Sequence, residues 1–269
     1  MVSFAFDPGV VAAIAVAEAL YLRAIRVLRR RGYEVPVGQQ AAWHVGIGLV
    51  VTGLISPVDT LSEELVSAHM LQHLLIADFA APFLLAGLRT PVLVFFLPRP
   101  VLVPLARRHG LRRLFRLARN PLVAIPLWMV TLYGWHLAPA FDAAVRHGWV
   151  HALQHASFVI GSLLVWWAAI DPKRGRPPGE LWKAGYVLGS RIPGMFLGVA
   201  FIVMRSPAYI AAYGESARHY ALSPLADQQI GGGLMLSLDT IVMLAGFAYF
   251  FYRAAAEHDR AERAAAATG

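Results

Sequence analysis

Apolar residues gather into seven long windows, separated by shorter stretches rich in arginine, proline and glycine. The windows cover residues 9–29, 38–55, 65–86, 121–138, 149–170, 185–204 and 230–252. Each has about the length that an α-helix needs to cross the roughly 30 Å hydrocarbon core of a bilayer. The pattern therefore predicts an all-α, polytopic membrane protein, in which residues 1–269 form a single domain of seven transmembrane helices.

The composition favours the same environment. Hydrophobic residues make up 58% of the chain and charged residues 15%, with a mean hydropathy of +0.55. This is far more apolar than an average soluble domain. There is no cysteine, so disulfides and thiolate metal sites are excluded, and any soft-metal site must use histidine and methionine. The first residues, MVSFAFDPG, lack the basic region and cleavage pattern of a signal peptide, so we expect an uncleaved start.

The basic residues predict how the helices are oriented. The net charge is +8, and most of the 24 Lys and Arg residues fall after the first, third and fifth windows or in the C-terminal tail. Because cytoplasmic loops carry the excess of positive charge, we expect the N-terminus outside and the C-terminus in the cytoplasm. Basic residues beside apolar windows indicate contact with lipid and no nucleic-acid partner. Residues 99–120, where leucine alternates with arginine at helical spacing, are expected to lie on the inner membrane surface.

Two pairs of histidines indicate a functional site. His69 and His73 lie four residues apart at the head of the third window, and His151 and His155 repeat this spacing at the head of the fifth. Residues i and i+4 share one helix face, so both imidazoles of a pair can reach one point. In the predicted orientation both pairs lie just below the outer surface, where His136 ends the fourth window. Ionisable residues inside spans are usually functional, so we expect a metal or haem site there.

Methionine offers a second kind of ligand. Met70 neighbours the first histidine pair, and Met204 closes the sixth window. Thioether and imidazole groups without thiolate favour copper, especially the reduced ion, over magnesium or calcium. Taken singly, each methionine is more typical of a side chain that fills a gap between helices.

Three other features stand out, and the first two leave alternatives open. Asp78 and Asp239 lie deeper in the third and seventh windows, where each is either a structural hydrogen-bond acceptor or part of a proton or ion relay. The 205–229 loop is a lid, a docking surface or an interfacial cover. The sixth window is expected to present a small-residue face for close helix contact, formed by Gly185, Gly189, Gly194 and Gly198.

Four motifs resemble those of the CtaG family of cytochrome c oxidase assembly factors, the multi-span type associated with caa-type oxidases. They are HMLQHLL at 69–75, GWHLAPAFDAAV at 134–145, HALQHASF at 151–158 and LADQQIGGGLM at 225–235. The resemblance implies a heptahelical protein of the bacterial plasma membrane that is needed for making active haem–copper oxidase and is suspected of supplying its copper. The functional residues it implies are His69, His73, His136, Asp142, His151, His155, Asp227 and Gln228.

Both lines lead to one hypothesis, a copper site open toward the outer face. His69, His73, His151 and His155 would be ligands, with His136 as a fifth or exchange ligand. Four polar side chains would fix the imidazole tautomers, namely Gln72, Asp142, Gln154 and Asp227. Such a protein is an assembly factor and not an enzyme, with oxidase subunits and an extracytoplasmic copper donor as partners.

Two alternatives remain from other classes of protein. In a membrane cytochrome, facing histidines on two helices would ligate haem axially. In an intramembrane zinc hydrolase, three histidines and an aspartate would hold zinc and activate water, with Asp142 or Asp227 as the general base.

Overall fold

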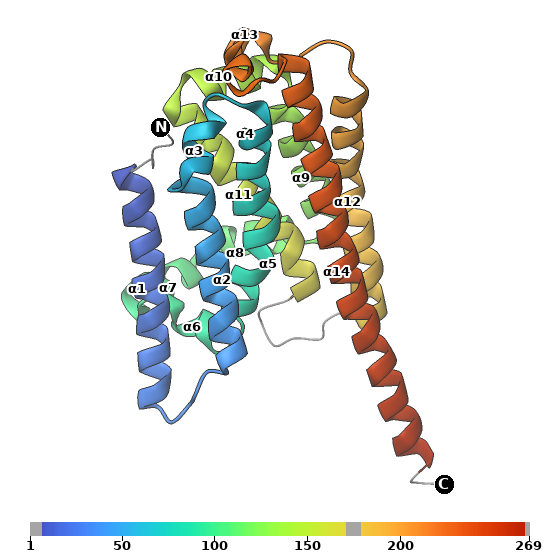
Figure 1. The fold of residues 1–269 in the computed structure, drawn as a ribbon. Helices are drawn as coiled ribbons and strands as arrows, with labels where there is room; N and C mark the ends of the chain where they lie inside the picture. The colour runs from blue at the N-terminus through green and yellow to red at the C-terminus, as the bar shows by residue number, and fades with distance from the viewer. Residues whose placement is uncertain (1–6, 171–178, 267–269) are drawn as a thin grey trace.

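The computed structural model describes residues 7–170 and 179–266, and every regular element within these ranges is helical (Figure 1). The all-α prediction is confirmed. The elements are α1 (Pro8–Arg30), α2 (Val37–Leu54), α3 (Pro57–Ser62), α4 (Val66–His73), η1 (Leu74–Phe79), α5 (Ala80–Gly87), α6 (Val92–Phe96), α7 (Arg99–Arg107), α8 (His109–Ala118), α9 (Pro121–Trp135), α10 (Ala138–Arg146), α11 (Gly148–Ile170), α12 (Glu180–Val203), α13 (Ile210–Tyr213), η2 (Ser216–Tyr220) and α14 (Pro224–Ala266).

Four of the described helices are long and apolar enough to cross a membrane. These are Val66–Gly87, Gly148–Ile170, Glu180–Val203 and Pro224–Arg260. A fifth crossing exists if α9 and α10, which meet at a bend of 72°, are counted as one span. Helices α1 and α2 occupy the first two predicted windows but are not among the four, so the count of seven spans and the orientation of the termini stay predictions.

The third window folds as one continuous helix with an irregular middle. Helix α4 leads into the π-helical turn η1, which continues as α5. A π-turn widens the helix by one residue per turn and often lies at a functional site. Here it directly follows His73 and contains Asp78. No pattern in the sequence predicts this turn.

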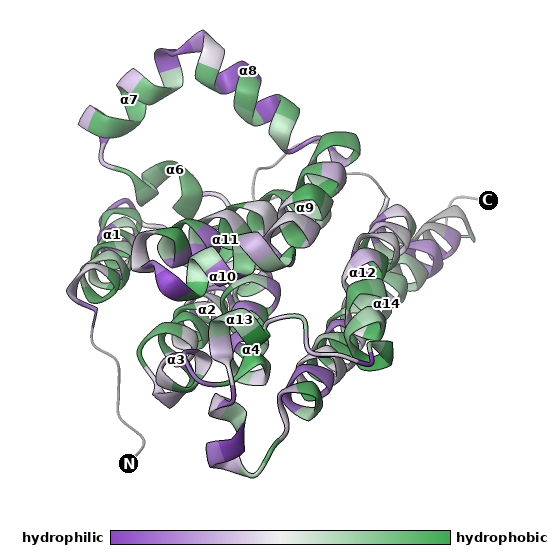
Figure 2. Ribbon diagram, turned by 90° about the horizontal axis from the view of Figure 1, so that it is seen from above, coloured by the Kyte–Doolittle hydropathy of each residue, from purple (hydrophilic) through white to green (hydrophobic). Residues whose placement is uncertain are grey.

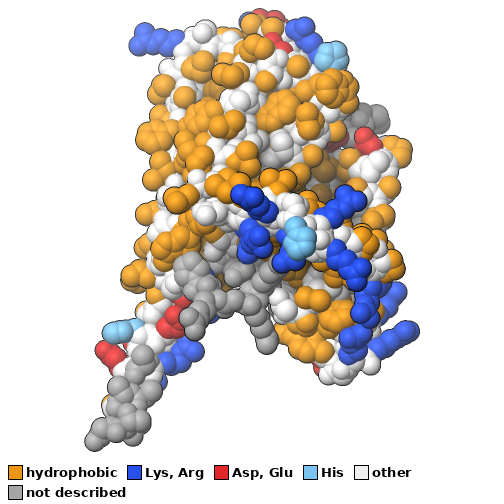
Figure 3. All heavy atoms as spheres, turned by 180° about the vertical axis from the view of Figure 1, so that it is seen from behind, with side chains coloured by type: hydrophobic (Ala, Val, Ile, Leu, Met, Phe, Trp, Pro, Cys, Tyr) orange, Lys and Arg blue, Asp and Glu red, His pale blue; other side chains and the backbone are white. Residues whose placement is uncertain are grey.

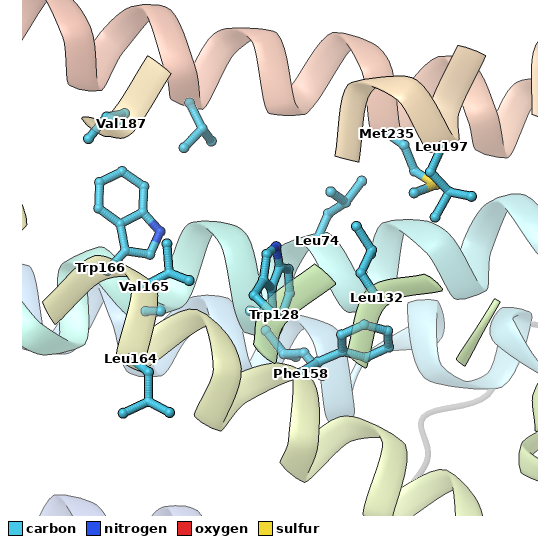
Figure 4. Packing of buried hydrophobic residues seen from close by; sticks show 14 of the residues in the cluster. Leu74, Trp128, Leu132, Phe158, Leu164, Val165, Trp166, Val187, Leu197 and Met235 are labelled. Atoms are coloured by element: carbon cyan, nitrogen blue, oxygen red, sulfur yellow. The ribbon is translucent and has the colours of Figure 1, made fainter. Parts of the chain in front are cut away.

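The main apolar core surrounds the histidines and continues along the bundle beyond them. It brings together Trp128 of α9, Phe158 of α11, Leu74 of η1 and Met235 of α14, all nearly inaccessible to solvent (Figure 4). A separate small cluster joins α1, α2 and α6, where the rings of Tyr21 and Trp43 stack at 4.4 Å. The main core therefore holds together the four helices that carry or face the histidines.

The basic segment lies at one side of the bundle. Helices α7 and α8 extend away from the other helices when the molecule is viewed from above (Figure 2). No side chain of either helix is buried, and Lys and Arg side chains gather across the lower part of the rear face (Figure 3). The predicted helical structure of 99–120 is thus confirmed, whereas its contact with lipid stays a prediction. Three other predicted basic inner-loop residues, Lys173, Arg174 and Arg176, lie outside the described residues.

Helices α12 and α14 pack side by side through glycine (Figure 2). A Cβ atom added at Gly198 would lie 2.8 Å from the carbonyl oxygen of Gly232, and one at Gly194 would collide with Asp239. The predicted small-residue face is therefore only half right. Added Cβ atoms at Gly185 and Gly189 would meet no described atom within 4 Å, because these residues lie on the far side of α12.

This contrast gives a matched pair of substitutions on one helix. Gly198→Ala should lower the free energy of unfolding by about 1–3 kcal/mol, because the backbones of α12 and α14 would have to separate. Gly189→Ala should be neutral or stabilise by up to about 1 kcal/mol, since alanine favours helix. Thermal unfolding of both variants in detergent measures the difference, and equal melting temperatures would contradict the observed packing.

Candidate metal centre

Four imidazoles from two neighbouring helices form one layer. His69 and His73 come from α4, and His151 and His155 come from α11. Across the helices, the ring centroids of His69 and His151 lie 5.0 Å apart and those of His73 and His155 lie 5.2 Å apart. One ring nitrogen each of His69, His73 and His151 lies within 4.8 Å of the others. The fourth ring, of His155, lies 4.1 Å from His151.

Most nitrogens of this layer lack a hydrogen-bond partner. Among the described residues, this holds for both ring nitrogens of His73 and for Nε2 of His69, His151 and His155. His69 and His73 are buried, with 1% and 6% of their surface exposed. A buried polar atom without a partner costs about 1–3 kcal/mol. Closely spaced imidazole nitrogens with unused lone pairs are the donor set that Cu or Zn takes, so the residues fit a bound metal ion.

Tyr213 of α13 fixes the tautomer of His69. Its hydroxyl lies 2.8 Å from the carbonyl oxygen of Ser62 and 3.0 Å from Nδ1 of His69. Burial raises the pKa of the Tyr213 hydroxyl well above its usual value, so it keeps its single proton. That proton is donated to the carbonyl of Ser62, and Nδ1–H of His69 therefore donates to the tyrosine oxygen. Nε2 of His69 is left unprotonated and available to a metal.

His136 stands apart from the other four. It lies at the bend between α9 and α10, where its Nδ1–H donates to the carbonyl oxygen of Leu132 at 2.7 Å. Its unprotonated Nε2 lies 3.3 Å from the Sδ atom of Met70. The rings of Phe141 and Phe158 contact His136 on one side and His69 or His73 on the other. His136 and Met70 thus form a second pair of soft donor atoms beside the layer.

The 205–229 loop covers the layer. The hydroxyl of Tyr209 donates to the carbonyl of His136 at 2.8 Å, and its ring stacks on Phe141 at 3.8 Å. Gln228 accepts from the backbone N–H of Ala208 at 2.6 Å and donates to Met204 Sδ at 3.6 Å. Gln228 and Met204 therefore anchor the loop and do not contact the imidazoles, so a role for them in gating the site stays a prediction.

Asp227 ties α14 to the helix that carries His69 and His73. Its carboxylate accepts from the backbone N–H groups of Val66 and Ser67, at 2.7 and 3.1 Å, and from the Ser67 hydroxyl. These N–H groups are at the N-terminus of α4, where helical donors otherwise have no partner. The sequence led us to expect that Asp227 would hold an imidazole. Instead it positions the histidine helix through its backbone.

Of the other three residues expected to contact the imidazoles, Gln72 points away from them, whereas Gln154 lies near them. Gln72 donates to the carbonyl of Gly53 at 3.0 Å and to Asp59, so the expectation that it fixes an imidazole was wrong. The physical reason is helical geometry, because one residue before His73 is a rotation of about 100° toward α2 and α3. Gln154 is fully buried between the histidines of α11, and Asp142 has one buried carboxylate oxygen. The side chain of Gln154 lies against that of His69, as expected of a residue that orients an imidazole, whereas the buried Asp142 oxygen has no partner among the described residues.

Sequence reasoning missed the two tyrosines of the loop. Tyr209 and Tyr213 lie four residues apart, the same spacing as the histidine pairs. This spacing could have suggested a common face, but their sequence gave no indication that they reach His136 and His69.

Comparison with known proteins adds independent information. Residues 19–257 match the model of a family described as the cytochrome c oxidase caa3 assembly factor. Uncharacterized proteins of Mycobacterium bovis and Mycobacterium tuberculosis are each 28% identical over 249 residues, covering 89% of this chain and 37% of theirs. One of Mycobacterium leprae is 26% identical over 248 residues. The chain thus spans well under half the length of these relatives. No solved structure matches it.

The role of Asp227 can be tested by amide exchange. Asp227→Ala should speed hydrogen exchange at the first turn of α4, residues 66–69, because loss of a helix cap costs about 0.5–2 kcal/mol. Asp7→Ala, which removes the cap of α1, is the matched control and should leave that turn unchanged. Unchanged exchange at 66–69 in Asp227→Ala would show that the carboxylate does not hold the helix.

Proposed function

Because the chain belongs to the family of cytochrome c oxidase caa3 assembly factors, we propose that it binds copper in the histidine layer and delivers it to the oxidase. Copper is the cargo in this proposal, and the protein is not an enzyme. The observation that carries it is the set of buried imidazole nitrogens without partners at the interface of α4 and α11. We infer a location in the bacterial plasma membrane, with oxidase subunits and an extracytoplasmic copper donor as partners.

The chemistry of the donor atoms supports copper. The layer offers imidazole nitrogens, and a thioether lies beside it at Met70. The three grouped ligand residues include no carboxylate, which hard ions such as Mg²⁺ and Ca²⁺ prefer. Reduced copper accepts three or fewer soft ligands readily, so His69, His73 and His151 suffice to hold it, with His155 as a neighbour for exchange.

The arrangement also suits release of the cargo. His151 and His155 are only partly buried, whereas His69 and His73 are buried. Nε2 of His136 and Sδ of Met70 lie 3.3 Å apart and are both soft donors. In this proposal copper passes between the layer and this second pair of donors across the small cavity that Met70, His73 and His136 line. The covering loop, held by Tyr209 and Gln228, would open for the oxidase subunit.

The alternatives differ in how well they suit this geometry. A haem macrocycle would have to lie between the facing imidazoles, whose ring centroids are only 5.0 and 5.2 Å apart across the two helices. This spacing argues against haem. Zinc hydrolysis fits better, because a three-histidine group leaves one coordination position for water and Asp142 has a buried oxygen without a described partner. Bound zinc without copper, with hydrolysis of an acyl lipid, would replace the copper proposal.

Metal analysis of purified protein tests the ligands. The wild type loaded with Cu(I) and desalted should retain near-stoichiometric copper, whereas His69→Ala with His155→Ala should lose most of it. His147→Ala with His219→Ala is the matched control, because both residues are exposed outside the layer, and it should bind like the wild type. Equal copper in the two double variants would refute the assignment.

The tyrosine that fixes His69 gives a finer test. Tyr213→Phe removes the oxygen that receives Nδ1–H of His69, so the Cu(I) dissociation constant should rise about 10-fold or more. Tyr220 lies in the same loop as Tyr213, and its hydroxyl donates to Glu64. Tyr220→Phe removes that hydrogen bond and should leave the dissociation constant unchanged. Competition with a Cu(I) chelator measures both. An unchanged constant in Tyr213→Phe would show that the tautomer of His69 does not matter for binding.

A further inference from the structure

A second charged cluster lies deeper in the bundle, away from the histidine layer. Arg191 of α12 pairs with Asp78 of η1 and, at 3.3 Å, with Asp239 of α14. The exposed fractions of the three side chains are 2%, 11% and 7%. Two carboxylates thus share one guanidinium. If both were ionised, the cluster would carry a net negative charge inside the membrane, which is costly.

The two carboxylates are not equivalent. Asp78 makes the closer contact with Arg191, and Asp239 the longer one. The second oxygen of Asp239 faces Gly194 of α12, where any side chain would collide with it. Two further side chains lie near the guanidinium: the ring of Trp166 of α11, which is not titratable, at 5.5 Å, and Tyr186 of α12, whose hydroxyl donates to the carbonyl of Val165 at 2.9 Å. Asp239 is therefore the carboxylate that gains least from ionisation.

A cavity connects this cluster with the basic end of the bundle, the end at which Arg89 and Arg253 lie. The cavity has a volume of about 450 Å³ and runs along α5 and α14 from Asp78 and Trp166 to Arg89 and Arg253. Glu180 and Lys183, which pair with each other at 2.7 Å, also line it. We call it the inner cavity. Asp78 lies at its deep end and also lines a small cavity beside His73 and His136.

Several hydrogen-bond donors around the cluster have no described protein partner and are available to water. Arg191 is 98% buried, yet its Nε and Nη2 atoms have no partner among the described residues. The same holds for Nε1 of Trp166, which lines the inner cavity. Water in a buried site needs two to four polar partners. The deep end of the inner cavity is formed by Asp78 and Trp166, whereas Arg191 and Asp239 lie behind these residues and do not line it. Water held by the unpartnered donors and the two carboxylates would therefore have to bridge the cavity and Asp239.

We propose that Asp239 is a proton-binding site, loaded from the basic end of the bundle through the inner cavity, while Asp78 and Arg191 remain an ion pair. The ligand is one proton, which neutralises the surplus carboxylate of the cluster. This role lies beyond copper delivery and does not depend on it. It resolves the choice between structural acceptor and relay for the two aspartates, because Asp78 takes the structural role and Asp239 the exchangeable one.

Infrared spectroscopy of the full chain in detergent at neutral pH counts the proton. The wild type should show the C=O band of one buried carboxylic acid, and Asp239→Asn should lose it while keeping its melting temperature, because asparagine resembles the protonated form. Asp259→Asn, an exposed position on the same helix, is the matched control and should keep the band. Arg191→Gln removes the cation beside Asp239, so the band should remain.

Two outcomes would overturn the proposal. One is that Asp239→Asn removes no acid band, either because the wild-type spectrum has none or because the variant keeps it. The other is an Asp239→Asn variant that unfolds as readily as Asp78→Asn, which would assign Asp239 a purely structural ion pair. The route is tested by Ala86→Trp, which fills the inner cavity and should slow exchange of the acid proton for deuterium while leaving the band in place. Exchange at the wild-type rate would refute loading through the cavity.

Discussion

The buried imidazoles of α4 and α11 are the constraint on which the upper half of the bundle depends. A bilayer offers no water to a polar group, so helices that carry such groups must bury them against each other and give them partners. His69, His73, His151 and His155 meet this requirement only in part, since five of their ring nitrogens have no described partner. The arrangement is costly for the folded chain alone and becomes favourable when a cation binds.

The surrounding structure holds the layer in place from outside. Asp227 of α14 anchors the first turn of α4, and Tyr213 of α13 fixes the ring of His69. Below, the π-turn η1 carries the chain from His73 to Asp78, where Arg191 links η1, α12 and α14. Polar contacts thus tie the histidine helix to the last helix at two heights. Glycines allow the close approach at both heights, Gly231 between α14 and α4 and Gly198 between α12 and α14.

Features that depend on a short segment of the chain can be predicted from the sequence, and contacts between distant segments cannot. The helices and the histidine pairs are predictable, because apolar windows and i, i+4 spacing are properties of short segments. The partners of the side chains are not. Tyr213 lies 144 residues from His69 along the chain, and Gln72 faces α2 and not its histidine neighbours. The π-turn and the 72° bend that sets His136 apart also depend on packing between helices.

X-ray absorption spectroscopy of the Cu(I)-loaded protein reports the ligands of the ion itself. A site shared by α4 and α11 should give coordination dominated by imidazole nitrogen, with at least two imidazoles per copper, and that signature should disappear when one histidine of each pair, on α4 and on α11, is replaced. Copper surrounded by oxygen alone, or an imidazole signature unchanged in that variant, would contradict a shared site between the two helices.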